Sequence, residues 1–173
     1  MADRRKGAGP ASAGIVVFRR RPGAAAGPDG VEILLVHPGG PFWADKNTHG
    51  WSIPKGEFDP ETESGEAAAV REFTEEIGRP PPDGPRLALR PFKAGRKRIE
   101  AWLVEGDLDA ESIESNSFEM EWPPKSGRTQ SFPEIDRAGW FSLVDAATKL
   151  HKGQLPLCRL IATAIIDGNQ GTR

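Results

Sequence analysis

The chain has 173 residues, of which 37% are hydrophobic and 28% charged, and this length suits a single folded domain with its own apolar core. The formal net charge is −2, which excludes a global field that would recruit nucleic acid or a membrane surface. The single cysteine, Cys158, excludes an internal disulfide. No apolar run has transmembrane length and the N-terminus is polar, so we predict a cytoplasmic protein without a signal peptide.

Two strands are predicted near the N-terminus. Residues 1–11 are basic and contain glycine and proline, which predicts a disordered tail before one domain spanning residues 12–167. Residues 12–20 have β-branched side chains at their centre and predict a strand. Residues 31–37 form a near-continuous apolar run, which predicts a second strand buried on both faces. Because the intervening segment is rich in turn residues, the two strands are expected to form a hairpin or lie side by side.

A helix is predicted over residues 65–77. Ser64 is a candidate N-cap, and the alanines that follow are strong helix formers. Gly78 suits the position after the last helical residue, and the prolines beyond it prevent continuation. Apolar residues repeat every four positions and predict one buried stripe, made of Ala69, Phe73 and Ile77.

Three carboxylates share another face of this helix. Glu72, Glu75 and Glu76 stand at positions i, i+3 and i+4, a spacing that places them together. Like charges at this spacing repel unless a cation neutralises them, and Mg²⁺ prefers oxygen ligands. A solvated acidic face is the alternative. Beside the glycine-containing loop that precedes the helix, the pattern predicts a platform for Mg²⁺ or Mn²⁺.

The segment after the helix is predicted to return to the sheet. Residues 79–85 are rich in proline and predict a rigid linker. Strands are predicted over residues 86–92 and 98–105, and residues 107–114 are expected to hold a helical turn. The basic run at residues 96–98 is a candidate to hold phosphates, with a solvated turn as the alternative.

A long loop or arm over the site is predicted at residues 116–130. It combines aromatic and acidic residues with two prolines and two cations. Phe118 and Trp122 are candidates either to stack on a base or to pack against the core. Glu119 and Glu121 in the same segment are candidates for a catalytic base.

The C-terminal third predicts a last strand followed by helices. Residues 131–143 read as the strand, residues 144–149 begin one helix, and residues 154–166 form another with helical apolar spacing. Residues 168–173 are predicted to be a tail. Strands that alternate with helices in this order predict a mixed sheet with helices on both faces, an α/β/α sandwich. Three histidines show no ligand spacing and are expected to be structural or solvated: His37, His49 and His151.

The stretch from Gly56 to Gly78, GEFDPETESGEAAAVREFTEEIG, resembles the Nudix box of Nudix hydrolases. That pattern is Gly, five residues, Glu, seven residues, then Arg-Glu-apolar-any-Glu-Glu-any-Gly-apolar. Its second half matches one for one at Arg71, Glu72, Phe73, Glu75, Glu76 and Gly78. Six residues rather than five separate Gly56 from Glu63, so Glu61 competes for the loop position. Arg79 also stands where the family prefers an apolar residue.

The resemblance implies a Nudix-type α/β/α sandwich and a pyrophosphohydrolase that needs Mg²⁺ or Mn²⁺. Its substrate would be a nucleoside diphosphate linked to another group. The sequence WSIPKGE looks like the Pro-Lys-Gly variants, which favours a nucleoside triphosphate or a diadenosine polyphosphate. Lys55 is expected to contact a substrate phosphate or to be a solvated turn residue. By the family's pattern, the Gly56 carbonyl would be a metal ligand together with Glu72, Glu75 and Glu76.

The charges of the site residues suggest a role for each of them. Arg71 is expected to orient the loop carboxylates by ion pairing, because a guanidinium holds two at once. Glu76 is expected to be essential for catalysis, and Glu72 or Glu134 to take the proton of the attacking water. The substrate is expected to contact four side chains: Lys55, Glu63, Phe118 and Trp122. The alternative is a non-catalytic Nudix module that binds a nucleotide or a protein, and the protein is expected to be a monomer or a homodimer.

Overall fold

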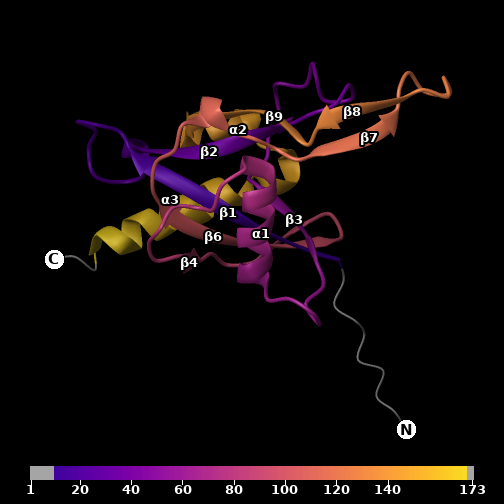
Figure 1. Cartoon of the computed structure of the whole chain (residues 1–173). Coiled ribbons are helices and arrows are strands. Elements are labelled where there is room, and N and C mark those ends of the chain that lie inside the picture. Colours follow the sequence, from indigo (N-terminus) through magenta and orange to yellow (C-terminus); the bar gives the residue numbers. More distant parts are fainter. Residues whose placement is uncertain (1–9, 171–173) are drawn as a thin grey trace, which may run out of the picture.

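In the computed structural model, residues 10–170 are described, and they form a seven-stranded mixed sheet, three α-helices and a two-stranded ribbon (Figure 1). The strands are β1 (Ala11–Arg20), β2 (Val31–Pro38), β3 (Lys55–Phe58), β4 (Leu87–Ala88), β5 (Phe92–Ala94), β6 (Lys97–Glu105), β7 (Ser117–Glu121), β8 (Thr129–Pro133) and β9 (Ile135–Ser142). The helices are α1 (Gly65–Ile77), α2 (Leu143–Lys149) and α3 (Pro156–Gln170). Most of the tail predicted over residues 1–11 lies outside the described residues, but Ala11 belongs to β1.

The sheet has the order β4-β6-β1-β2-β9, with β3 paired to β1 and β5 paired to β6. β1 and β6 run parallel, whereas the other pairs are antiparallel. The sheet is therefore mixed, as predicted, and β1 and β2 are antiparallel neighbours. Their central positions explain why both strands are apolar along nearly their whole length.

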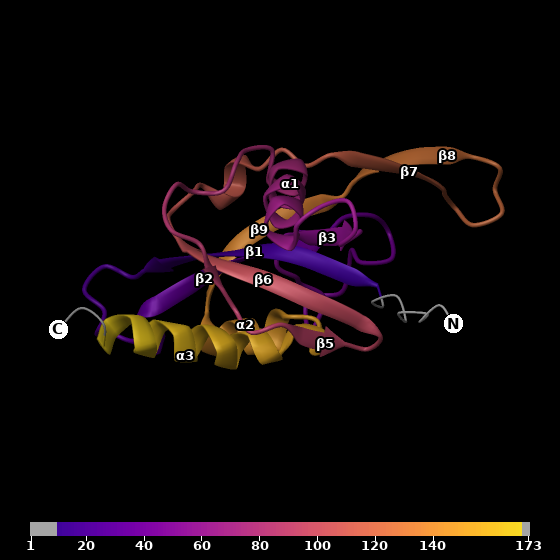
Figure 2. The ribbon, with the colours of Figure 1, turned by 90° about the horizontal axis from the view of Figure 1, so that it is seen from below.

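The helices cover opposite faces of this sheet (Figure 2). Ile15 and Val17 of β1 pack on one face with Phe73 of α1. The alternating residues Val16 and Phe18 enter the core on the other face, which α2 and α3 close. Alternation along a strand sends successive side chains to opposite faces, so one strand serves both cores. The predicted α/β/α sandwich is confirmed.

Helix α1 has the predicted bounds. The Ser64 side chain accepts a hydrogen bond from the Ala67 backbone N–H at 3.2 Å, as an N-cap does. Gly78 ends the helix in the left-handed conformation, with φ of 84°. Phe73 and Ile77 are buried against the sheet. This packing turns the opposite, acidic side of α1 away from the core.

One predicted strand is wrong in detail. The strand expected over residues 86–92 is split into β4 and β5. Pro91 lies between them and has no N–H to donate to the sheet.

The segment predicted as a long loop or arm is a β-ribbon. β7 and β8 pair antiparallel from Ser117 opposite Pro133 to Glu121 opposite Thr129. The ribbon extends beyond the sandwich in both views (Figures 1 and 2). The strand predicted over residues 131–143 is also wrong, because Glu134 separates β8 from β9. The residues predicted as one loop and one strand therefore form a hairpin and a separate edge strand of the sheet.

The C-terminal helix is longer than predicted. α3 runs to Gln170, so the tail expected from residue 168 is helical over its first three residues, and residues 171–173 lie outside the described residues. Cys158 on α3 is half-buried against the core, and burial raises the pKa of its thiol, which supports a structural role. Within residues 10–170, no helix combines the length and the apolar character needed to cross a membrane.

Candidate functional site

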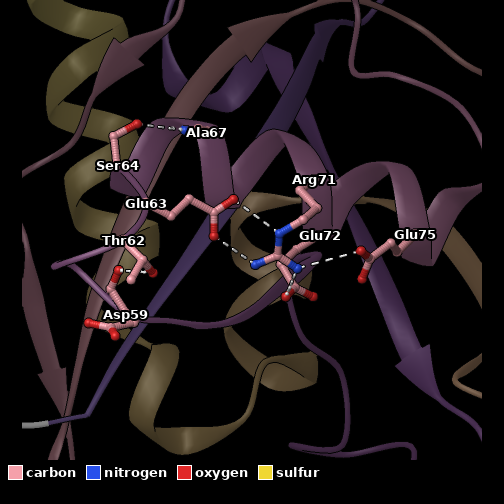
Figure 3. Close-up of polar contacts among 8 residues, drawn as sticks. All are labelled: Asp59, Thr62, Glu63, Ser64, Ala67, Arg71, Glu72 and Glu75. Atoms are coloured by element: carbon pink, nitrogen blue, oxygen red, sulfur yellow. Dashed lines mark hydrogen bonds and ion pairs between the residues drawn. The ribbon is translucent and has the colours of Figure 1, made fainter.

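Arg71 on α1 holds three carboxylates, as Figure 3 shows. Its Nε and Nη2 donate to the two oxygens of Glu63, each at 3.0 Å. Its Nη1 donates to Glu72 at 2.7 Å and lies 3.5 Å from Glu75. The ion pair predicted for Arg71 is present, and the Glu63 and Glu72 carboxylates raise the pKa of the guanidinium. The two-pronged bond fixes the loop against the helix.

Glu63, rather than Glu61, is the loop carboxylate beside the helix. Glu61 is exposed, and its backbone N–H donates to the Asp59 side chain at 2.9 Å. Both oxygens of Glu63 accept hydrogen bonds from Arg71. Glu63 therefore positions Arg71 in this structure, and the substrate contact expected of Glu63 stays a prediction.

Gly56 lies directly against Glu72. A Cβ atom added to Gly56 would lie 1.9 Å from Cδ of Glu72 and about as close to both carboxylate oxygens. Only a residue without a side chain leaves the Glu72 carboxylate in place. The structure thus brings together two of the predicted metal ligands, one from β3 and one from α1.

Glu76 is the most perturbed carboxylate of the site. Burial raises its pKa to about 8, and the neighbouring charges of Glu72 and Glu134 act in the same direction. The Lys55 ammonium and backbone N–H oppose this rise. Burial also lowers the pKa of Lys55. Lys55 is half-buried beside Glu76, and its contact with a substrate phosphate stays a prediction.

Glu134 is the one candidate base outside the helix that faces these carboxylates. Glu134 is exposed overall, but partial burial of its carboxyl group raises its pKa, and the charges of Glu72 and Glu75 add to the effect. Glu119 and Glu121 are exposed and alternate along β7 with the half-buried Phe118 and Met120, which face the loop after β2. The geometry therefore places Glu134, and not the two ribbon glutamates, near the helix.

The donor set fits a divalent cation by chemistry, although it is not gathered in metal-binding geometry. Among residues 10–170, no three acidic, histidine or cysteine side chains converge closely enough to hold a metal ion. Arg71 binds Glu72 and Glu75, and Lys55 lies against Glu76, so cations of the protein separate the carboxylates. Burial is the main cause of the raised pKa values of Glu76 and Glu134, and neighbouring carboxylates add to it. A hard cation that replaced the Arg71 and Lys55 partners would find the oxygen ligands that it prefers.

A cavity of about 390 Å³ opens beside Lys55, Glu76 and Glu134. Four further side chains of its wall were not singled out as site residues from the sequence: Trp43, Trp51, Lys97 and His151. They come from two loops and from β6, far apart in the chain. His151 was expected to be structural or solvated, and only Lys97 carried a signal, as part of the basic run at residues 96–98.

His37 is structural, as predicted. It is fully buried, with Nδ1 2.8 Å from the Asp136 carboxylate and Nε2 2.9 Å from the Lys46 carbonyl oxygen. These contacts tie the loop after β2 to β9. They fix the segment that carries Trp43 into the cavity wall.

The two predicted base-stacking residues occupy different places. Phe118 lines a second cavity, next to the first, together with Glu134. The Trp122 ring lies edge-on to Phe42, with 5.4 Å between ring centroids, and lines neither cavity. In this structure Trp122 packs against Phe42, and the substrate contact expected of Trp122 stays a prediction.

The titration of Glu76 gives a testable signature in metal-free protein. Its folded pKa of about 8 lies above the ordinary value of 4.5, so its contribution to stability is complete below about pH 4.5. That contribution is lost as the pH rises to about 8, and it amounts to at most about 5 kcal/mol, since each pKa unit is about 1.4 kcal/mol. We expect the thermal midpoint measured with a chelator to fall over this range, and to fall less in Glu76→Gln. Parallel curves for the two proteins would contradict the assignment.

Comparisons with known proteins agree with this geometry. The family model for the NUDIX domain matches residues 10–161. Structures with the same fold include a C. elegans Ap4A hydrolase binary complex, with 22% identity, coverage of 91% of this chain and 98% of that one, and a TM-score of 0.57. The NUDIX domain of Shewanella oneidensis NrtR, complexed with ADP ribose, has 17% identity, coverage of 95% and 94%, and a TM-score of 0.56.

A third structure, the MutT protein from Methanosarcina mazei Go1, has 18% identity, coverage of 92% and 94%, and a TM-score of 0.51. No curated protein sequence matches the chain significantly. At these identities the solved structures show a shared fold, whereas the family model covers most of the chain. With the Arg71–Glu63 pair and the glutamates of α1 in the places described above, this chain belongs to the Nudix family.

Proposed function

We propose that this chain hydrolyses a pyrophosphate linkage in a nucleoside diphosphate that is joined to another group, with Mg²⁺ or Mn²⁺ as cofactor. One observation carries the proposal. Glu76 and Glu134 line a cavity whose wall also contains Lys55 and Lys97. Negative groups for a cation and positive groups for phosphate thus lie side by side.

The cofactor would be held by the Gly56 carbonyl and by Glu72, Glu75 and Glu76. When bound, a divalent cation neutralises phosphate oxygens and makes a coordinated water a better nucleophile. The protein supplies the rest of the mechanism. Arg71 holds Glu72 in place, and Lys55, as a point charge, attracts a phosphate of the substrate.

Glu134 is our candidate for the base that accepts the proton of the attacking water, with Glu72 as the second candidate. A raised pKa favours this role because a base works best when its pKa is near the working pH. The Glu134 side chain also lines the cavity that would hold the substrate.

The cavity favours a nucleotide as the substrate. Trp43 and Trp51 supply aromatic surface, and His151 adds a polar group at the wall. We propose a nucleoside triphosphate or a dinucleoside polyphosphate, which is consistent with the Pro54-Lys55-Gly56 turn and with the fold shared with an Ap4A hydrolase.

A substrate panel tests this proposal. The full chain would be incubated with Mg²⁺ or Mn²⁺ and diadenosine tetraphosphate, nucleoside triphosphates, ADP-ribose or a sugar nucleotide, and the products separated by chromatography. We expect cleavage of one nucleotide class, abolished by a chelator. Binding of a nucleotide by folded protein without any cleavage would instead support the non-catalytic module.

A further inference from the structure

The ribbon and the loop after β2 enclose a second cavity of about 340 Å³. Its walls are residues 38–43 on one side and Phe118 and Met120 of β7 on the other, with Glu134 at the boundary. We call it the ribbon cavity. Pro38, Trp43 and Glu134 also line the first cavity, so the two share a wall beside the candidate base.

The ribbon cavity is built by direct contacts between its two sides. The Gly39 backbone N–H donates to the Glu134 carbonyl oxygen at 2.8 Å. A Cβ atom at Gly40 would lie 3.0 Å from the Phe118 ring, so the loop and the ribbon already touch there. Farther out, Phe42 packs edge-on against Trp122. The ribbon is therefore fixed to the loop at its base and along its length.

The residue pattern of β7 directs an apolar face into this cavity. Phe118 and Met120 are half-buried and line it, whereas Glu119 and Glu121 are exposed. Phe118 stands opposite Phe132 of β8, with 6.1 Å between ring centroids. Aromatic neighbours restrict the orientation of the Phe118 ring and so preform one surface of the cavity.

The chemistry of the two cavities differs. The first contains Lys55 and Lys97, which attract phosphate, whereas Glu134 is the only charged side chain among the described residues that line the ribbon cavity. A phosphate is therefore disfavoured in the ribbon cavity. A flat, uncharged aromatic group is favoured, because Phe118 and the 58% exposed Phe42 offer ring surface for stacking.

We propose that the ribbon cavity binds the second nucleobase of a substrate in which two nucleosides are joined by a polyphosphate. The polyphosphate would pass Glu134, with one nucleoside in each cavity. A nucleoside triphosphate has only one base and leaves the ribbon cavity empty. This inference rests on the proposed function. Of the two substrate classes proposed there, it selects the dinucleoside polyphosphate over the nucleoside triphosphate.

The test compares diadenosine tetraphosphate with ATP in the presence of Mg²⁺. Phe118→Ala is expected to lower kcat/KM for diadenosine tetraphosphate by about 10- to 100-fold, the range for losing one stacked base. It is expected to leave kcat/KM for ATP within about twofold, since ATP does not reach the ribbon cavity. Glu119→Ala, on the exposed face of the same strand, is the matched control and should change neither value.

Phe118→Leu keeps the apolar side chain without the flat ring and replaces Phe118→Ala if thermal melts show that the alanine variant is unstable. An equal effect on both substrates, or no effect on diadenosine tetraphosphate, overturns the inference. If the wild type cleaves neither nucleotide, the proposed function fails and calorimetry decides the inference separately. Tighter binding of diadenosine tetraphosphate than of ATP, erased by Phe118→Ala, supports the ribbon cavity as a base site, and equal affinities overturn it.

Discussion

Replacing Glu76 by glutamine is expected to lower kcat by about 10³-fold while the protein stays folded. Glu76 is largely buried, lies beside Lys55, and lines the cavity that would hold the substrate. Glutamine keeps the size of the side chain and an oxygen that can accept the Lys55 backbone hydrogen bond. It lacks the negative charge that a divalent cation needs from its ligands. The substitution therefore removes the charge needed to bind a divalent cation and keeps the packing of the side chain.

The matched control is Glu66→Gln, an acidic residue in the first turn of the same helix. Glu66 pairs with Arg86 at 2.8 Å on the exposed surface, and its replacement should leave kcat unchanged. Thermal melts with and without Mg²⁺ give a second readout, because the stabilisation by Mg²⁺ should be lost in Glu76→Gln. A Glu76→Gln protein with full activity would remove Glu76 from the mechanism.

Helix α1 could be predicted with its bounds because its signals are local. Ser64 marks the start of the helix as its N-cap, and Gly78 marks its end in the left-handed conformation. The buried apolar stripe follows from the helical period alone. The contact between Arg71 and Glu75 is equally local, because one turn of helix separates the two residues and brings their charged groups to 3.5 Å. The predicted fold class followed from the order of such elements.

The loop carboxylate could not be chosen from spacing alone, since the loop has one residue more than the family pattern. In the structure a turn at Asp59 takes up the length. The Asp59 carbonyl accepts hydrogen bonds from the N–H groups of Thr62 and Glu63, both at 3.0 Å, while its side chain binds the Glu61 N–H. This turn holds Glu61 outside and directs Glu63 to Arg71.

The cavity walls escaped prediction because they depend on contacts between distant segments. Trp43 reaches the first cavity only because His37 ties its loop to β9 through Asp136. His151 comes to the same wall through the hydrogen bond of its backbone N–H to the Trp51 carbonyl, at 2.8 Å. Neither pairing has a periodicity or a short motif that a single sequence would reveal.

Replacing Gly56 by alanine is expected to lower kcat/KM by about 10²-fold with little loss of stability. The added methyl group would overlap the Glu72 carboxylate, 1.9 Å from its Cδ atom. The end of a glutamate side chain moves at low cost in folding free energy, so the overlap is relieved by rotation of Glu72. That rotation takes Glu72 away from Arg71, which now holds it at 2.7 Å, and from the ligand position proposed for it.

Activity and stability should therefore separate in Gly56→Ala. The expected results are a normal thermal midpoint without metal, a higher Mg²⁺ concentration for half-maximal activity, and a reduced maximal rate. Gly168→Ala is the matched control, because among the described residues no atom outside its own helical turn and chain neighbours lies within 4 Å of a methyl group added there. Full activity of Gly56→Ala at the same Mg²⁺ concentration would show that the position of Glu72 is unimportant. A large loss of stability would show that the overlap strains the backbone of β3, and that the close contact between Gly56 and Glu72 serves the fold rather than the site.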